Sequence, residues 1–225
     1  MKATILKLCG NHSLQDLQRS VNSGAPYIGI VFAESKRKVD PVQCGEWLKQ
    51  IEKAEEQKYV GVFVNPTLQE ISHVLSHVPL DIIQFHGNES PEEIIEIKHS
   101  TGLTVWKAIH HNQNGIKKMK SYNRVVDGYV IDSKVKGAWG GTGATFDWES
   151  IPAYNKEAEA QGVQCLIAGG ITPLNVEEIL TFSPQGIDIS SGIETNGSKD
   201  SKKIQLIMER LKNSCYNEKK NPFSL

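Results

Sequence analysis

The hydrophobic positions of this chain fall into short runs rich in β-branched residues, separated by longer stretches of mixed apolar and polar residues. Short apolar runs bounded by turn residues are typical of buried strands, and the longer amphipathic stretches are typical of helices. Strands are predicted over residues 3–8, 27–32, 59–64, 81–86, 103–109, 127–132, 163–168 and 186–191.

Each predicted strand is followed by a stretch with helix signals. Ser13 is a helix cap for the first stretch and Gly24 ends it, while Asp40 caps the second with Pro41 at its first helical position. The predicted helices cover residues 13–24, 40–57, 66–78, 90–100, 112–122, 147–161, 172–182 and 198–214.

The regular alternation of strands and helices decides the fold class. Strands joined through helices imply right-handed crossovers and a parallel sheet. An open doubly wound sheet usually has five or six strands, whereas eight similar units fit a closed (β/α)8 TIM barrel. We therefore predict an α/β chain with one barrel domain over residues 1–213 and a polar, frayed C-terminal tail over residues 214–225.

Composition argues against several classes of partner. The formal net charge is −1 and the basic residues are scattered, which argues against nucleic acid or an anionic membrane surface as a partner. No run approaches the roughly 20 apolar residues that span a bilayer. The N-terminal residues lack the features of a signal peptide, so we expect a cytoplasmic protein.

The four cysteines, Cys9, Cys44, Cys165 and Cys215, lie far apart and show no spacing typical of a metal site. In a reducing compartment they are expected to stay free thiols. Cys9 differs from the others because it ends the first predicted strand and is followed at once by Gly10. In a barrel this places the thiol at the C-terminal face, where active sites are built.

Other polar residues follow strands at the same face. Lys36, Arg37 and Lys38 follow the second strand, and Arg37 is the best suited to bind a carboxylate because its planar guanidinium makes two parallel hydrogen bonds. Solvated surface charges are the alternative interpretation. His86 ends the fourth strand, where it either takes part in catalysis or, more commonly, holds the following loop by hydrogen bonds.

Asp132 ends the sixth strand, so its carboxyl group is expected to face the mouth of the barrel. The loop after it is long and rich in glycine, including Gly143. Such a loop can close over a ligand, and glycines let backbone N–H groups approach a phosphate. A flexible linker has a similar composition.

Small residues open the next two loops. Gly169–Gly170 follow the seventh strand and Ser191–Gly192 follow the eighth. Barrels often bind phosphate with these two loops. The sequence therefore predicts a phosphate site formed by Gly143, Gly169, Gly170, Ser191 and Gly192.

Seven segments occur in order between Lys7 and about Asp200: KLCG, FAESKRKV, QFHGNE, VIDS, GGTGATFDW, IAGGITPLNV and DISSGIE. Together they resemble the phosphoribosylanthranilate isomerase family of tryptophan biosynthesis. The resemblance implies an isomerase without a cofactor or metal, whose partner is a small phosphosugar–anthranilate substrate. The oligomeric state stays open.

The resemblance also implies the reaction and the roles of three residues. The reaction is the Amadori rearrangement of N-(5-phosphoribosyl)anthranilate, an aminoaldose, to 1-(2-carboxyphenylamino)-1-deoxyribulose 5-phosphate. Cys9 falls on the family's general base, Asp132 on its general acid and Arg37 on the residue that holds the anthranilate carboxylate. Such chemistry requires an acid to protonate the furanose ring oxygen and a base to remove the C2 proton.

Three further residues are expected to support this site. A free cysteine with a pKa of about 8.5 is mostly neutral at pH 7, so its thiolate needs a nearby positive charge. Lys7 lies two residues before Cys9 and shares its inward face, and the iminium of the bound substrate is a second source of charge. Asp188, on the neighbouring eighth strand, is expected to face Lys7 because a buried carboxylate needs a partner. His86 is the third residue.

Two departures from the usual family pattern bear on substrate affinity. Ala144 stands where the family often has a lysine or arginine, which removes one phosphate contact. Asn11 and His12 follow Gly10, where the family more often has an apolar residue and then Thr or Lys. Neither departure touches Cys9, Asp132 or Arg37.

Two rival functions stay open on the sequence. The first is a related isomerase of histidine biosynthesis, a family that uses two aspartates as acid and base, whereas the first strand here ends in Cys9. The second is a barrel without catalytic activity that binds a phosphorylated metabolite. Binding of a phosphate ester without turnover would favour this second function.

Overall fold

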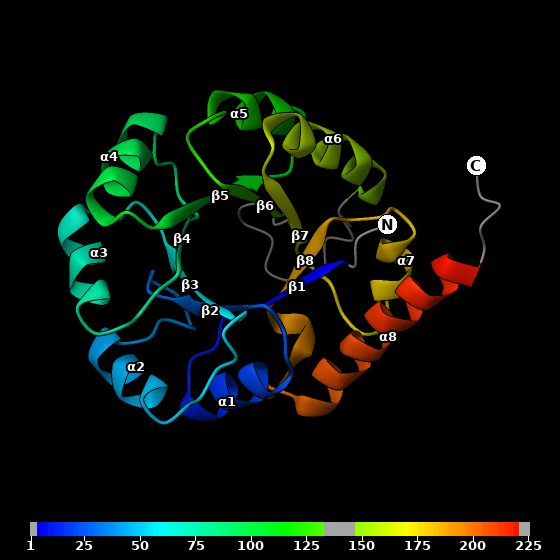
Figure 1. Ribbon diagram of the computed structural model, residues 1–225, viewed down its shortest axis with the longest axis horizontal. Coiled ribbons are helices and arrows are strands. Elements are labelled where there is room, and N and C mark those ends of the chain that lie inside the picture. The colour runs from blue at the N-terminus through cyan, green and yellow to red at the C-terminus, as the bar shows by residue number, and fades with distance from the viewer. Residues whose placement is uncertain (1–3, 133–146, 221–225) are drawn as a thin grey trace.

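The computed structural model of the protein describes residues 4–132 and 147–220. Among these residues eight parallel strands form a closed barrel, in chain order, with the last strand paired to the first. Figure 1 shows the strands at the centre and the helices around them. The predicted (β/α)8 barrel is confirmed. The strands are β1 (Ile5–Leu8), β2 (Tyr27–Val31), β3 (Lys58–Phe63), β4 (Ile82–Phe85), β5 (Thr104–His110), β6 (Gly128–Asp132), β7 (Gln164–Ala168) and β8 (Gly186–Ile189).

The outer layer consists of α-helices, one after each strand, with two short 3₁₀ turns and one small hairpin. The α-helices of the described chain are α1 (Leu14–Asn22), α2 (Pro41–Leu48), α3 (Leu68–Leu75), α4 (Pro91–Thr101), α5 (Gly115–Ser121), α6 (Ile151–Gln161), α7 (Val176–Leu180) and α8 (Ser201–Lys220). The 3₁₀ turns are η1 (Trp148–Ser150) and η2 (Ser191–Ile193), and the hairpin pairs β9 (Glu194–Thr195) with β10 (Ser198–Lys199).

Capping side chains set where several helices begin. Ser13 accepts a hydrogen bond from the backbone N–H of Asp16 at the start of α1, and Asp40 accepts one from Gln43 at the start of α2. These bonds satisfy donors that the first turn of a helix leaves free. Helices α3 and α4 begin with reciprocal capping boxes, Thr67 with Glu70 and Ser90 with Glu93.

Helix α2 is shorter than the sequence pattern predicts. It ends at Leu48, although the amphipathic stretch continues to Gln57. The amide of Gln57 is buried and donates to the backbone carbonyls of Val21 and Ala25, at the end of α1 and beyond it. These tertiary hydrogen bonds hold the segment after α2 in a non-helical path, which local propensity does not reveal.

Helix α8 continues to Lys220, so it enters the segment that the sequence predicts as a frayed tail. The rest of that segment, residues 221–225, lies outside the described residues, and the division of the chain at residue 213 stays a prediction. Over the described residues, no helix combines the length and the apolarity that crossing a membrane requires.

The barrel separates two apolar layers. The larger layer lies between the strands and the helices, whereas a smaller one fills the barrel interior. The interior layer consists of Val60, Ile82, Trp106, Ala108, Val130, Leu166 and Ala168, with Tyr27 packed against it. Alternate residues of each strand point inward, which is why polar side chains of the same register also enter the barrel.

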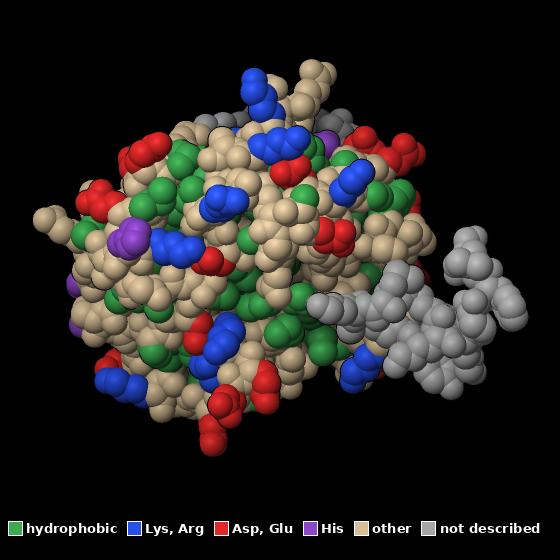
Figure 2. All heavy atoms as spheres, turned by 45° about the horizontal axis from the view of Figure 1, so that its top comes forward, with side chains coloured by type: hydrophobic (Ala, Val, Ile, Leu, Met, Phe, Trp, Pro, Cys, Tyr) green, Lys and Arg blue, Asp and Glu red, His purple; other side chains and the backbone are tan. Residues whose placement is uncertain are grey.

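Charged side chains are mixed on the surface. On the face shown in Figure 2, basic and acidic residues are interspersed and form no large patch of one sign. This distribution agrees with the formal net charge of −1. Long-range attraction to a highly charged partner therefore has no support from this face.

Candidate active site

Cys9 directly follows β1, at the carboxyl end of the barrel, as the sequence predicts. Its backbone N–H donates to the carbonyl of Ile189 over 2.8 Å. Gly29 on β2 leaves room for the thiol, because a Cβ there would lie 2.7 Å from Sγ. The turn that follows is held by the buried amide of Asn11, which donates to the carbonyls of Leu8 and Gly29 over 2.9 Å each. Asn11 therefore serves to fix the position of Cys9.

Lys7, Cys9 and Asp188 form the inner wall of this site. Lys7 is fully buried and its Nζ lies 2.8 Å from Oδ2 of Asp188, so the predicted pairing is present. Burial alone would lower the pKa of Lys7, but the negative charge of Asp188 raises it above its usual value. Lys7 is therefore a permanent positive charge inside the barrel.

The same surroundings also shift the pKa of the Cys9 thiol, but here burial raises the pKa and the neighbouring lysine lowers it. Burial raises the pKa of Cys9 above its usual value, and the charge of Lys7 offsets only part of this effect. The neighbouring carboxylate of Asp188 raises it further. Without a ligand, Cys9 is consequently a neutral thiol near pH 7, and an additional positive charge is needed to form the thiolate.

Arg37, which follows β2, is paired with Glu194, which follows β8. Its Nε and one terminal nitrogen donate to the two carboxylate oxygens of Glu194 over 2.8 and 2.7 Å. Glu194 also accepts from the buried Lys199 over 2.8 Å. A Cβ at Gly10 would lie 2.5 Å from Cδ of Arg37, so the arginine stem packs over the turn after Cys9.

The two cations around Glu194 shift its titration. Burial would raise the pKa of this carboxyl group, but its hydrogen bonds to Arg37 and Lys199 hold the pKa below the usual value. The hydrogen bonds to Glu194 raise the pKa of Arg37, and burial lowers the pKa of Lys199. Glu194 is therefore ionised at neutral pH and competes with any ligand carboxylate for Arg37.

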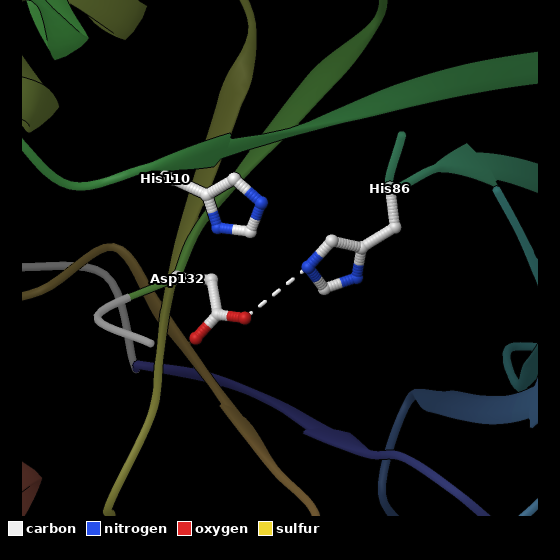
Figure 3. A group of neighbouring side chains, drawn as sticks. All are labelled: His86, His110 and Asp132. Carbon is white, nitrogen blue, oxygen red and sulfur yellow. Dashed lines mark hydrogen bonds and ion pairs between the residues drawn. The ribbon is translucent and has the colours of Figure 1, made fainter. Parts of the chain in front are cut away.

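Asp132 is the last residue of β6 and is almost completely buried. Nε2 of His86 lies 3.2 Å from Oδ2 of Asp132, and His110, the last residue of β5, lies beside both (Figure 3). The hydrogen bond links the two titratable groups whichever of them holds the proton. Burial and the nearby charge of His86 lower the pKa of His110, so this imidazole is neutral at pH 7.

The loops after β7 and β8 meet closely. Gly169 and Gly170 have φ values of 99° and 67°, a backbone region that other residues rarely adopt. A Cβ at Gly192 would overlap the carbonyl oxygen of Ile171, so only glycine allows the two loops to touch there. Ser191 and Gly192 begin η2 beside this contact. The predicted phosphate residue Gly143, like Ala144, lies outside the described residues.

Comparison with known protein families assigns the chain to a family. The family model described as N-(5′-phosphoribosyl)anthranilate isomerase matches residues 6–210 of the chain, which includes all eight strands of the barrel except Ile5, the first residue of β1. The chain belongs to this isomerase family. The resemblance that seven short segments indicate is thereby confirmed over nearly the whole barrel.

Curated relatives and solved structures agree with this family. The N-(5′-phosphoribosyl)anthranilate isomerase of Geobacillus thermodenitrificans is 52% identical over 207 residues, which cover 92% of this chain and 93% of the relative. That of Bacillus subtilis is 44% identical over 211 residues, 94% and 96% of the two chains. A crystal structure of phosphoribosylanthranilate isomerase from Thermotoga maritima superposes with a TM-score of 0.79 at 30% identity, covering 93% of this chain and 99% of that one.

Three residues of the candidate site are missing from the sequence analysis. Glu194 and Lys199 belong to the β9–β10 hairpin, whose Asn-Gly turn at residues 196 and 197 is a recognisable hairpin signal. The turn signal does not reveal that Glu194 of this hairpin pairs with Arg37. His110 ends β5, just as Asp132 ends β6. Its position at a strand end was therefore the signal that could have placed it at the barrel mouth.

Proposed function

We propose that this chain converts N-(5′-phosphoribosyl)anthranilate to 1-(2-carboxyphenylamino)-1-deoxyribulose 5-phosphate in L-tryptophan biosynthesis, with Cys9 as general base and Asp132 as general acid. The observation that carries these roles is the arrangement of a thiol close to the buried charge of Lys7 and a histidine-bonded carboxyl group at the same end of one barrel. A solved phosphoribosylanthranilate isomerase with a TM-score of 0.77 and 29% identity is described in complex with the reduced form of this product. A cytoplasmic location stays a prediction from the sequence.

The first step requires a proton donor. Asp132 in its protonated form gives its proton to the furanose ring oxygen, the C1–O bond breaks, and the ring opens to an iminium ion. His86 keeps the carboxyl group oriented through the 3.2 Å contact and can return a proton to it.

The second step requires a base. The iminium ion brings a positive charge next to Cys9, and together with Lys7 this charge lowers the pKa of a thiol that burial otherwise raises. The thiolate then removes the proton from C2. The C2–H electron pair forms the C1=C2 bond, the π pair of the C1=N bond returns to nitrogen, and the resulting enaminol tautomerises to the ketone. Substrate binding thus activates its own base.

Arg37 is proposed to bind the anthranilate carboxylate. In the structure its guanidinium is held by Glu194, so the incoming carboxylate either shares or replaces that partner. Lys199 stays with Glu194 in both cases, which leaves the displaced carboxylate paired. Because Glu194 pairs with Arg37 when no substrate is bound, the guanidinium of Arg37 is not left as an unpaired charge in the empty site.

The loops after β7 and β8 are proposed to hold the phosphate through their backbone N–H groups. Gly192→Ala is expected to separate these loops, because the added methyl group overlaps the carbonyl of Ile171. Misplacement of about 1 Å at a binding site can cost about 10²-fold in rate, so we expect kcat/KM to fall by about this factor, mostly through KM. Steady-state kinetics measure this loss.

A matched control for this variant is Gly162→Ala. Gly162 ends α6 with a φ of 72°, and a Cβ there meets no atom within 4 Å. The control is therefore strained but distant from the loops, and it is expected to lower the melting temperature without changing KM. An unchanged KM in Gly192→Ala would rule out the phosphate role of this contact.

Lys7→Met tests the charge that supports Cys9. Removing one partner of a buried ion pair leaves Asp188 uncompensated, so unfolding in urea is expected to show a loss of about 3–5 kcal/mol. The pKa of Cys9 rises further without Lys7, and the base must be deprotonated to act. The rising limb of the kcat–pH profile is therefore expected to move to higher pH.

The double variant Lys7→Met/Asp188→Leu separates the two effects. An apolar pair in place of the ion pair is expected to recover most of the stability. The thiol, however, still lacks its cation. If the pH profile of Lys7→Met coincides with that of the wild type, Lys7 has no part in activating Cys9.

The reaction itself is tested with two aminoaldoses. Phosphoribosylanthranilate, generated in situ, is expected to lose its fluorescence when the wild-type protein is added. The related aminoaldose of histidine biosynthesis is expected to stay unchanged, because that family's two-aspartate arrangement is replaced here by Cys9 and Asp132. Turnover of the second substrate alone would overturn the proposed function, and binding without turnover of either would indicate a metabolite-binding barrel.

A further inference from the structure

His86, His110 and Asp132 meet at the carboxyl ends of three consecutive strands. His86 follows β4, His110 ends β5 and Asp132 ends β6 (Figure 3). One ligand atom from each side chain lies within 4.8 Å of the other two. His110 and Asp132 are also direct partners in the β5–β6 register, so the barrel holds these two side chains next to each other.

We propose that these three side chains form a binding site for a divalent transition metal ion, with Zn²⁺ as the preferred ion. Binding at this site is a property of the three side chains alone and does not rest on the proposed function. The consequence of metal binding for catalysis does rest on the proposed function, because Asp132 is also the proposed general acid.

The geometry suits a tetrahedral ion with one open position. Zinc binds histidine nitrogen at about 2.0–2.1 Å, so neighbouring ligands around it are about 3.4 Å apart. Nε2 of His86 and Oδ2 of Asp132 are already 3.2 Å apart. Two imidazoles and one carboxylate leave a fourth position for water or a substrate oxygen, as in catalytic zinc sites.

The donor set distinguishes zinc from the commoner divalent ions of the cell. Imidazole ligands favour zinc and its transition-metal neighbours, whereas Mg²⁺ and Ca²⁺ prefer oxygen ligands only. The Nδ1 atom of His110 is buried and has no hydrogen-bond partner among the described residues. A buried nitrogen without a partner is costly, and a metal ion would satisfy it.

The surroundings hold the His86 side of the cluster in place. Buried Lys107 donates to the carbonyl of Gly87 over 2.9 Å and to the carboxylate of Glu89 over 3.0 Å. Glu89 in turn accepts from the backbone N–H of Gly87. The turn directly after His86 is therefore fixed by a buried ion pair, which limits how far this ligand can move away from the other two.

A bound zinc ion would oppose the proposed catalysis. The ion holds the Asp132 carboxylate in its ionised form, so the carboxyl group has no proton to give to the ring oxygen. We therefore expect zinc to inhibit turnover reversibly, and a chelator to restore it. This part of the inference fails together with the proposed function, whereas metal binding is measured without substrate.

The test titrates the metal-free, full-length protein with Zn²⁺ alone by calorimetry, and with Co²⁺ by visible absorption. One ion per chain is expected, with the intense visible bands of tetrahedral Co²⁺. His110→Gln is expected to weaken this binding at least 10²-fold, and His86→Gln is the second variant if the first does not fold. Equal affinity in a folded ligand variant, or no binding by the wild type, would overturn the proposal.

Two further groups of the described residues are competing zinc ligands for which the experiment needs controls. His73 and His77 lie four residues apart at α3, with ring centroids 5.2 Å apart, so His73→Gln/His77→Gln is the matched control and is expected to bind the ion as the wild type does. Cys9 is the second competitor. A thiolate-to-cobalt charge-transfer band in the near ultraviolet would place the metal on a cysteine and overturn the proposed ligand set.

Discussion

Cys9→Ala is expected to lower kcat by about 10²–10⁴-fold, the usual contribution of a positioned base. The variant lacks only Sγ, which Gly29 accommodates against β2, so the barrel is expected to fold. KM is expected to change little, because the carboxylate and phosphate contacts come from other residues. Steady-state kinetics, following the loss of substrate fluorescence, give both constants, and far-ultraviolet circular dichroism reports the fold.

Cys44→Ala is the matched control for this variant. Cys44 is buried in α2, away from the barrel mouth, and burial raises its pKa to about 12. This thiol is inert at neutral pH, so its loss is expected to reduce stability slightly and leave kcat unchanged. If Cys9→Ala retains the activity of this control, another group removes the C2 proton.

Asp132→Asn is expected to cause a second loss of about 10²–10⁴-fold in kcat. The amide has nearly the same size and can still bond His86, but it has no acidic proton for the ring oxygen. Steady-state kinetics of the variant and the wild type measure this loss.

Asp40→Asn is the control for replacing a carboxylate by an amide at a position outside the site. Asp40 caps α2 through a hydrogen bond from Gln43, and asparagine is an equally good cap. The control is therefore expected to keep both stability and kcat. A kcat of Asp132→Asn equal to that of this control would assign the acid to another group, with His86 the nearest candidate.

The barrel could be predicted because each unit carries its own local evidence. β-branched runs, capping residues and helix-ending glycines repeat for each strand and helix, and eight repeats fit closure. The end of α2 could not be predicted in this way. Gln57 determines it through hydrogen bonds to the end of α1, which are contacts between distant residues.

Some features of the site could be predicted from local sequence patterns, whereas others depend on contacts between distant residues. Cys9, Asp132, Lys7 and Asp188 follow from strand ends and from the alternation of side chains along a strand. The engagement of Arg37 by Glu194 joins residues 157 positions apart, and no local pattern reports it. The raised pKa of Cys9 is likewise a balance of burial against Lys7, which only the folded structure reveals.

The central claim is that a thiol and a carboxyl group at one end of this barrel carry out the rearrangement. Its most direct test is a single-turnover measurement of product formation from phosphoribosylanthranilate, with wild type, Cys9→Ala and Asp132→Asn in excess over substrate. The wild type is expected to form the aminoketose, and each folded variant to form it at least about 10²-fold more slowly. Product formation at the wild-type rate by either variant, or none by the wild type, would contradict the account.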